Sequence, residues 1–234
     1  MFKEIEESFS PKSIGDIVFS NDESRELVED LVSGARQFPI TEGKCGILLY
    51  GVPGTGKSAL AKLLPEEIEK ARGGYSAFED YIQIEPDSNG LEVLEKIRRQ
   101  TQHIPIIGSY HYFVLDEVDN LTANAMKMLK SVMNARDSIF IMTTNSFHKV
   151  EPGVKDRCYC IPFNAAPVGS WLPYARRLLS HAGVTGITDV QLSAVLEPCN
   201  GSARQIKEAI ESVILKVRRT KVAPKPTSAV ETLP

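Results

Sequence analysis

Gly51-Val-Pro-Gly-Thr-Gly-Lys57-Ser58 fits the pattern G-x-x-x-x-G-K-[ST] at every specified position. The run before it, Gly46-Ile-Leu-Leu-Tyr50, is typical of a short buried strand, and Ala59-Leu-Ala-Lys-Leu-Leu64 after it is typical of a helix start. Glycines let the backbone bend so that successive N–H groups surround a phosphate, and a helix N-terminus adds partial positive charge. The strand and helix on either side disfavour the alternative, a glycine-rich hairpin with a solvated lysine.

This pattern assigns chemistry to its residues. We expect the Lys57 ammonium to reach the β- and γ-phosphates of a nucleotide and the Ser58 hydroxyl to hold Mg²⁺. The residues expected to bind the nucleotide here are Pro53, Gly54, Thr55, Gly56, Lys57, Ser58 and Ala59.

Composition sets the frame for this site. The chain has 234 residues, enough for one large domain or one domain plus a small appendage, with 42% hydrophobic and 24% charged residues. A net charge of −3 argues against wholesale attraction to nucleic acid but allows a local basic face. No apolar run approaches the ~20 residues of a membrane span, and the acidic start lacks the apolar segment of a signal peptide. We therefore expect a cytoplasmic protein without a membrane partner.

The cysteines are Cys45, Cys158, Cys160 and Cys199. Their spacing matches no zinc-ligand pattern, and a cytosolic chain of this size needs no disulfides. We expect reduced, mostly buried thiols.

Strands alternate with helices between residues 45 and 145. We predict strands at 47–50, 81–85, 112–115 and 138–144, and helices at 57–71, 91–102 and 123–134. Met126, Leu129 and Met133 recur at helical spacing, which predicts core packing. The alternation predicts an α/β fold with a parallel sheet covered by helices on both faces.

The pattern changes after Pro162. No strong strand is predicted there, and helices are expected at 171–181, 189–196 and 203–219. The predicted organisation is a nucleotide-binding α/β domain over 1–165, a small helical domain over 166–220 and a disordered tail over 221–234.

Paired acids form the second signal, because Asp116 and Glu117 end the apolar run that starts at His111. A nucleoside triphosphatase needs one carboxylate near Mg²⁺ and another to orient or deprotonate the attacking water. Asp116 suits the first task, usually through a water ligand, and Glu117 suits the second. The alternative is a pair of solvated loop acids.

Further polar residues are weaker candidates. Asn145 follows a predicted strand and could contact the γ-phosphate or the attacking water, although asparagine also favours turns. Arg157, placed past the sheet, and Arg204, at the start of the last helix, suit phosphate binding but would otherwise be surface arginines.

These stretches together resemble an AAA+ ATPase, and within that superfamily the small subunits of clamp loaders. The resemblance covers the chain up to the tail and is carried by Phe9–Val18, Gly51–Ser58, Ile84–Arg99, Asp116–Lys130, Asp156–Cys158 and Gly201–Arg204. Two positions depart from the pattern of that group. Asp156 stands where a serine is usual, and Val118 stands where the group's D-E-A-D segment has its alanine.

The resemblance implies a three-layer P-loop ATPase domain followed by a small α-helical lid, with ATP and Mg²⁺ between them. It implies that Ile17 and Val18 pack around the adenine, that Arg204 senses the γ-phosphate of its own chain, and that Arg157 acts on a neighbouring subunit's ATP. In that group a C-terminal collar holds the pentamer together. This sequence stops before such a domain would begin, so it is either a piece of a longer chain or a minimal protein that assembles through its ATPase faces.

The function expected from these features is Mg-dependent ATP hydrolysis in a clamp-loader-like assembly that acts in DNA replication or remodels something on DNA. Two alternatives stay open. One is an AAA+ protein remodeller, or a helicase or transposase loader, without a sliding clamp. The other is an ATP-dependent assembly scaffold with little turnover. Residues that could contact a DNA backbone are Lys127, Lys130, Arg136 and Lys149, although scattered lysines are more often solvated.

Overall fold

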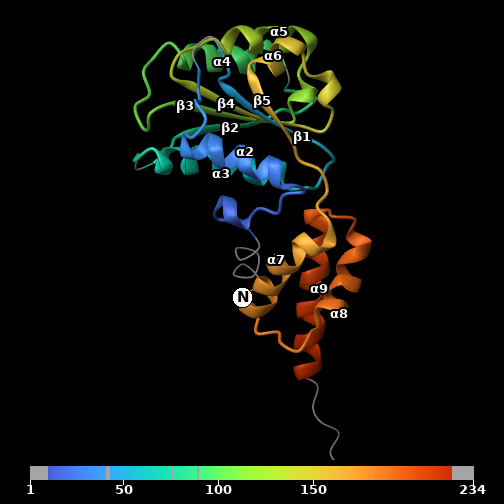
Figure 1. Ribbon diagram of the computed structural model, residues 1–234. Helices are drawn as coiled ribbons and strands as arrows, with labels where there is room; N and C mark the ends of the chain where they lie inside the picture. The colour runs from blue at the N-terminus through green and yellow to red at the C-terminus, as the bar shows by residue number, and fades with distance from the viewer. Residues whose placement is uncertain (1–9, 41–42, 75, 89, 223–234) are drawn as a thin grey trace, which may run out of the picture.

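The computed structural model describes residues 10–40, 43–74, 76–88 and 90–222 (Figure 1). The strands are β1 (Gly46–Tyr50), β2 (Glu79–Gln83), β3 (His111–Asp116), β4 (Ser138–Thr144) and β5 (Cys158–Pro162). The α-helices are α2 (Asp22–Ser33), α3 (Lys57–Ala71), α4 (Leu91–Gln100), α5 (Ala123–Val132), α6 (Pro152–Asp156), α7 (Val168–His181), α8 (Asp189–Leu196) and α9 (Ala203–Val222). Short 3₁₀ turns are η1 (Ile14–Asp16), η2 (Val118–Asn120), η3 (Phe147–Lys149) and η4 (Glu197–Cys199).

The five strands form one parallel sheet in the order β2-β3-β4-β1-β5. Helices α4, α5 and α6 cover one face, and α2 and α3 cover the other (Figure 1). The predicted α/β architecture with helices on both faces is confirmed. Because the strands are parallel, the carboxyl ends of β1, β4 and β3 lie side by side at one edge of the sheet.

Helix α3 connects this edge to the core. It starts at Lys57, directly after Gly56 in a left-handed conformation (φ 104°). Its apolar residues Leu60, Leu64 and Ile68 are fully buried against the sheet. The first turn of α3 is therefore fixed by the packing of its later turns.

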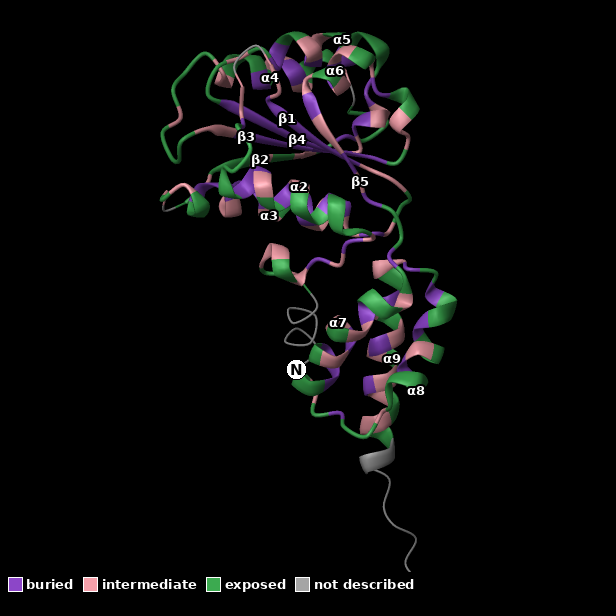
Figure 2. Cartoon of the chain, in the orientation of Figure 1, coloured by how far each residue is buried: buried purple, intermediate pink, exposed green. Residues whose placement is uncertain are grey.

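The opposite face of the sheet has its own apolar layer. Met126, Leu129 and Met133 are buried there with residues of α4 and the central strands, which confirms the predicted packing stripe (Figure 2). In the part of the chain that the structure describes, no helix combines the length and apolar character needed to cross a membrane.

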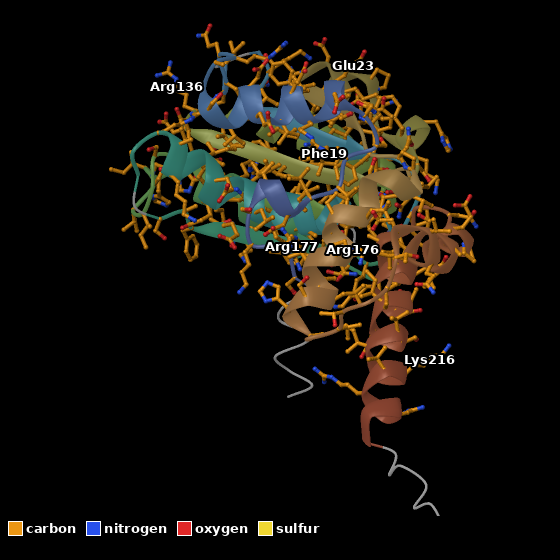
Figure 3. All side chains as sticks on the ribbon, turned by 60° about the horizontal axis from the view of Figure 1, so that its bottom comes forward. Phe19, Glu23, Arg136, Arg176, Arg177 and Lys216 are labelled. Carbon is orange, nitrogen blue, oxygen red and sulfur yellow. The ribbon has the colours of Figure 1, made fainter. Side chains whose placement is uncertain are left out.

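Helices α7, α8 and α9 enclose a separate apolar cluster beside the α/β layers, with Trp171, Leu192 and Ile206 among its buried members (Figure 1). An ion pair links Arg177 of α7, which is labelled in Figure 3, to Asp16 of η1. The exact domain boundaries at 165 and 220 stay predictions. Helix α9 continues to Val222, and residues 223–234 of the predicted tail lie outside the described residues.

Some sequence predictions were wrong in detail. Strand β2 lies two residues earlier than predicted, and α2, α6 and β5 were not predicted from the sequence. The run Cys158-Tyr-Cys-Ile-Pro162 carries proline and half-buried residues, which an edge strand tolerates because one side of it has no strand partner. Arg157 thus immediately precedes the last strand of the sheet and does not lie past the sheet.

Glu69 is a fully buried carboxylate on α3. It accepts hydrogen bonds from the Ser109 backbone N–H at 2.7 Å, the Ser109 hydroxyl at 3.1 Å and the Tyr112 hydroxyl at 2.9 Å. These bonds tie the C-terminal part of α3 to the segment that enters β3.

We expect Glu69→Ala to lower the free energy of unfolding by about 3 kcal/mol, because it leaves the buried Tyr112 hydroxyl without an acceptor and breaks both bonds from Ser109. Urea denaturation followed by circular dichroism measures this change. The matched control is Glu67→Ala on the same helix, whose side chain makes an i,i+3 ion pair with Lys70 at 3.7 Å and should cost less than ~0.5 kcal/mol. Equal costs for the two variants would contradict the structural role of the Glu69 network.

Candidate active site

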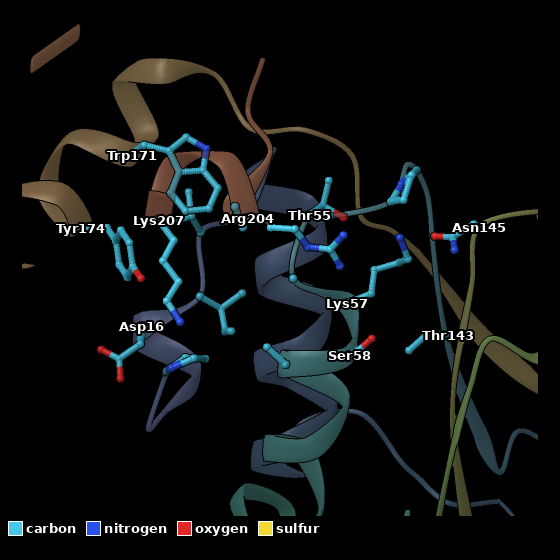
Figure 4. Close-up of a pocket in the computed structure, with 18 of the residues that line it drawn as sticks. Asp16, Thr55, Lys57, Ser58, Thr143, Asn145, Trp171, Tyr174, Arg204 and Lys207 are labelled. Atoms are coloured by element: carbon cyan, nitrogen blue, oxygen red, sulfur yellow. The ribbon is translucent and has the colours of Figure 1, made fainter. Parts of the chain in front are cut away.

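A cavity of about 410 Å³ opens between the carboxyl edge of the sheet and helices α7 and α9 (Figure 4). The sequence-predicted residues that line it are Ile17, Val18, Pro53, Gly54, Thr55, Gly56, Lys57, Ser58, Ala59, Glu117, Asn145 and Arg204. The structure thus brings together residues from five parts of the chain. Phe9, the first residue of the predicted adenine segment, lies outside the described residues.

The loop from Gly51 to Ser58 is shaped by its glycines. Gly51, Gly54 and Gly56 have φ values of 149°, 79° and 104°, and residues that carry a Cβ rarely adopt such positive φ values. A Cβ on Gly51 would lie 2.5 Å from the carbonyl oxygen of Phe163. The Thr55 hydroxyl lies 3.0 Å from that same carbonyl, so the loop is fixed against the chain that leaves β5.

Lys57 is 6% exposed and its ammonium lies inside the loop. It donates to the carbonyl oxygens of Gly51 at 3.0 Å and Val52 at 2.7 Å. Burial lowers the pKa of Lys57, while the negative charge of Asp116 and its neighbouring acids raises it, and the net shift is downward. The loop therefore encloses a cation that an incoming phosphate can engage by exchanging these carbonyl contacts.

Asp116 lies behind the cavity lining, 5% exposed, where its carboxylate accepts hydrogen bonds from three hydroxyls. Ser58 donates to Oδ1 at 2.8 Å, Thr143 donates to the same oxygen, and Tyr81 donates to Oδ2 at 2.8 Å. Burial and the bond to Asp116 raise the pKa of the Tyr81 phenol, so it remains a donor at neutral pH. This arrangement joins the phosphate-loop helix to the carboxyl end of β3.

Glu117 lines the cavity next to Asp116 in a left-handed backbone conformation, with φ 60° and ψ 50°. Its backbone N–H donates to the Thr143 hydroxyl at 3.0 Å. Its carboxylate accepts from the Asn120 side-chain amide at 3.3 Å, and that amide also donates to the Ile84 carbonyl at 2.9 Å. The strained conformation turns Glu117 out of the strand and toward the cavity.

Asn145 is exposed and lines the cavity at the end of β4. Asp119 fixes this strand end, because its carboxylate accepts from the Thr144 hydroxyl at 2.8 Å and from the Asn145 backbone N–H at 3.3 Å. These two hydrogen bonds therefore fix the backbone that carries the Asn145 side chain.

Helices α7 and α9 provide the opposite wall. The Arg204 backbone N–H donates to the Gly54 carbonyl at 3.4 Å, so α9 starts on top of the phosphate loop. Trp171 and Tyr174 of α7 face the cavity as an edge-to-face pair with ring centroids 5.7 Å apart (Figure 4). Burial raises the pKa of Tyr174 to about 12. Ile17 and Val18, which directly follow η1, line the same cavity.

Arg157 lies apart from this cavity. Its guanidinium donates to the Asn134 side chain and to the Gly153 carbonyl, each at 2.9 Å. Its carbonyl accepts from Gly46 N at the amino end of β1, whereas the phosphate loop leaves the carboxyl end of that strand. A strand of this length spans roughly 16 Å. Arg157 therefore lies at the amino end of β1, too far from the cavity at the carboxyl end to act on it within the same chain.

The donor set fits Mg²⁺ held together with phosphates. Within the described residues no group of three or more His, Cys, Asp or Glu side chains could hold a metal ion by itself. Mg²⁺ in phosphate sites needs only one or two protein oxygens, because water and phosphates complete its shell. The Ser58 hydroxyl and the Asp116 carboxylate, 2.8 Å apart, provide such a pair. Of the cysteines, Cys45, Cys158 and Cys199 are buried and Cys160 is half-buried.

Several site residues were missed by sequence reasoning: Asp16, Tyr81, Asp119, Asn120, Thr143, Trp171, Tyr174 and Lys207. Asp119 and Asn120 follow the recognised acid pair after one intervening residue, Val118, so their closeness to it in the sequence was the available signal. Tyr81 carries no such signal, because it reaches Asp116 only through the pairing of β2 with β3.

A phosphate loop between β1 and a helix, with an acid pair at the end of β3, defines a P-loop nucleoside triphosphatase. Residues 47–162 match the sequence model of the AAA family, the "ATPase family associated with various cellular activities". The expected resemblance to AAA+ ATPases is thereby confirmed.

Curated relatives narrow the resemblance to clamp-loader small subunits. Replication factor C small subunit 2 of Pyrobaculum islandicum is 26% identical over 210 residues, which cover 88% of this chain and 62% of that protein. The replication factor C small subunit of Thermofilum pendens (61% covered) and replication factor C subunit 4 of Encephalitozoon cuniculi (63% covered) are also 26% identical over 88% of this chain. The chain thus spans less than two thirds of the length of these relatives.

Known structures support the fold. The RuvB Holliday junction branch migration motor of Thermotoga maritima matches 92% of this chain and 68% of its own, with a TM-score of 0.71 and 16% identity. A variant of the same RuvB gives a TM-score of 0.72 at 15% identity. At these identities the likeness concerns the fold alone.

Substituting Gly51 tests the close approach of the loop to Phe163. We expect Gly51→Ala to lower the free energy of unfolding by about 1–3 kcal/mol, because the backbone conformation is strained and the Cβ meets backbone atoms. Thermal or urea unfolding measures the cost. Gly34→Ala is the control, since Gly34 also has positive φ (80°), but no atom of the described residues lies within 4 Å of its Cβ position. A smaller cost at Gly51 than at Gly34 would contradict this description of the loop.

Proposed function

We propose that this chain is the ATPase part of a clamp-loader-like protein that binds and hydrolyses ATP with Mg²⁺ and acts in DNA replication. One observation carries the proposal: the Ser58 hydroxyl and the Asp116 carboxylate meet at 2.8 Å beside the enclosed Lys57. This combination of a phosphate loop, a cation and a metal-binding pair suits a nucleoside triphosphate more than any other ligand.

The lining residues that the sequence predicted each have a proposed task. Backbone N–H groups between Pro53 and Ala59 surround the phosphates, and Lys57 neutralises their charge. The apolar side chains of Ile17 and Val18 border the base. Arg204, at the first turn of α9, contacts the γ-phosphate from the opposite wall of the cavity.

Two further residues act on the attacking water in this proposal. Glu117 accepts its proton, and Asn145 orients it with its side-chain amide. Both line the same cavity as Lys57. The contact between Asn120 and the Glu117 carboxylate has to give way for Glu117 to reach that water.

The metal would be held by Ser58 and Asp116. Bound there, Mg²⁺ would neutralise charge that develops on the phosphate oxygens during transfer. Thr143 keeps its hydrogen bond to Asp116 and so maintains the direction of the carboxylate.

Arg157 is proposed to act on a neighbouring subunit, because it lies at the opposite edge of the sheet from its own phosphate loop. Assembly through the ATPase faces would place it at the next cavity. DNA contacts are proposed for Lys127, Arg136 and Lys149, which are exposed. Lys130 is a weaker candidate, since it pairs with Glu151 at 3.1 Å.

The names of the relatives favour a clamp-loader role over the alternatives from the sequence. An ATP-dependent scaffold has no use for a catalytic base, yet Glu117 lines the cavity. ATP turnover stimulated by a sliding clamp and primed DNA would support the loader. Stimulation by an unfolded or adaptor protein instead would support a protein remodeller.

We expect Glu117→Gln to bind ATP normally but to hydrolyse it at least about a hundredfold more slowly, because a positioned base is lost. Lys57→Ala should lose ATP binding. Phosphate release measures turnover, and the emission of Trp171, the one tryptophan of the sequence, measures binding from the cavity wall. Wild-type turnover in Glu117→Gln would remove this residue from its proposed role.

We expect Arg157→Ala alone to lose about a thousandfold or more in turnover, as when an arginine acting across subunits is removed. Mixing it with Lys57→Ala should restore activity, because Arg157→Ala subunits keep an intact loop and Lys57→Ala subunits keep the arginine. Light scattering with and without ATP checks that the subunits assemble. Arg98→Ala, which changes an exposed arginine of α4 that has no proposed role, is the control. Full activity of Arg157→Ala would contradict action in trans.

A further inference from the structure

Asp116 is the acceptor at which three elements of the fold converge. Ser58 comes from α3, Thr143 from β4 and Tyr81 from β2, and each donates a hydroxyl to its carboxylate. Two of these donors share Oδ1, whereas Tyr81 donates to Oδ2. The two oxygens of this carboxylate therefore have different surroundings.

Tyr81 is held in place by more than its hydroxyl. It lies in the edge strand β2, in register with Val114 of β3, two residues before Asp116. The Lys62 ammonium lies 3.9 Å from the centre of its ring, a distance typical of a cation–π contact. Strand pairing and the Lys62 ammonium over the ring fix the direction from which the phenol reaches Asp116.

A carboxylate that ligates a metal through one oxygen can rotate about its Cβ–Cγ bond, and a hydrogen bond to the other oxygen opposes that rotation. Oδ2 is that other oxygen here, because Oδ1 lies beside Ser58. Partners of this kind orient the ligand and raise metal affinity.

We propose that Tyr81 is a positioning residue for the metal: its hydroxyl fixes Asp116 Oδ2 so that Oδ1 faces the place where Ser58 and the nucleotide phosphates hold Mg²⁺. This inference rests on the proposed ATP-binding function and extends it to a residue on the edge strand. It assigns to Tyr81 no contact with the nucleotide itself.

The simpler explanation is that the bond only stabilises the sheet. A matched comparison exists in the same molecule, because the Tyr112 hydroxyl donates to the Glu69 carboxylate at 2.9 Å, away from the cavity lining. Tyr112→Phe thus removes the same type of bond without touching Asp116.

The test measures Mn²⁺ binding to the full chain in complex with ADP by electron paramagnetic resonance. We expect Tyr81→Phe to weaken Mn²⁺ binding by about tenfold or more, the usual cost of losing a partner of a metal ligand. Its affinity for ADP in EDTA should equal that of the wild type, because no nucleotide contact is lost. Tyr112→Phe should unfold at a lower urea concentration yet bind Mn²⁺–ADP like the wild type.

Unchanged Mn²⁺ affinity in Tyr81→Phe, or an equal loss in Tyr112→Phe, would overturn the inference while leaving nucleotide binding by the wild type intact. A loss of ADP affinity in EDTA would also overturn it, since that result would give Tyr81 a role in the cavity itself. Failure of the wild type to bind ADP at all would instead overturn the proposed function, and this inference with it.

Discussion

The hydrogen bond between Ser58 and Asp116 is the contact on which the site depends, because it joins chain segments from strands that are not neighbours. The phosphate loop leaves β1, the acid pair ends β3, and β4 lies between them. Thr143 of β4 donates to the same carboxylate and completes the connection. A one-residue slip of β4 would turn Thr143 to the other face of the sheet. The strand register therefore also determines the geometry of the site.

Buried charge is the electrostatic cost of this arrangement. Lys57 and Asp116 are nearly inaccessible to water, and a buried charge is tolerated only when it is hydrogen-bonded. Lys57 donates hydrogen bonds to two carbonyl oxygens of its own loop, and Asp116 accepts hydrogen bonds from three hydroxyls. Neither residue needs the other as a direct partner. Both remain available to a polyanion and a cation that arrive together.

The sequence predicted best what is local. The phosphate loop, helix α3 and strand β4 follow from patterns within a few neighbouring residues, and their bounds agree with the structure. Strand β5 was missed because its residues suit an edge position that only the sheet order reveals. Tyr81 and Arg157 show the same limit: one is brought to Asp116 by strand pairing, and the other is kept from the cavity by the direction of β1.

The ion pair between Asp16 and Arg177 links the N-terminal turn to α7. Its side chains are 20% and 43% exposed, so dissolved ions can reach and screen the attraction. The pKa of Asp16 stays low because the Lys12 backbone N–H and Arg177 outweigh the effect of burial. The carboxylate therefore remains charged at neutral pH. A higher salt concentration should therefore loosen the attachment of α7, which carries Trp171 and Tyr174, to the N-terminal turn.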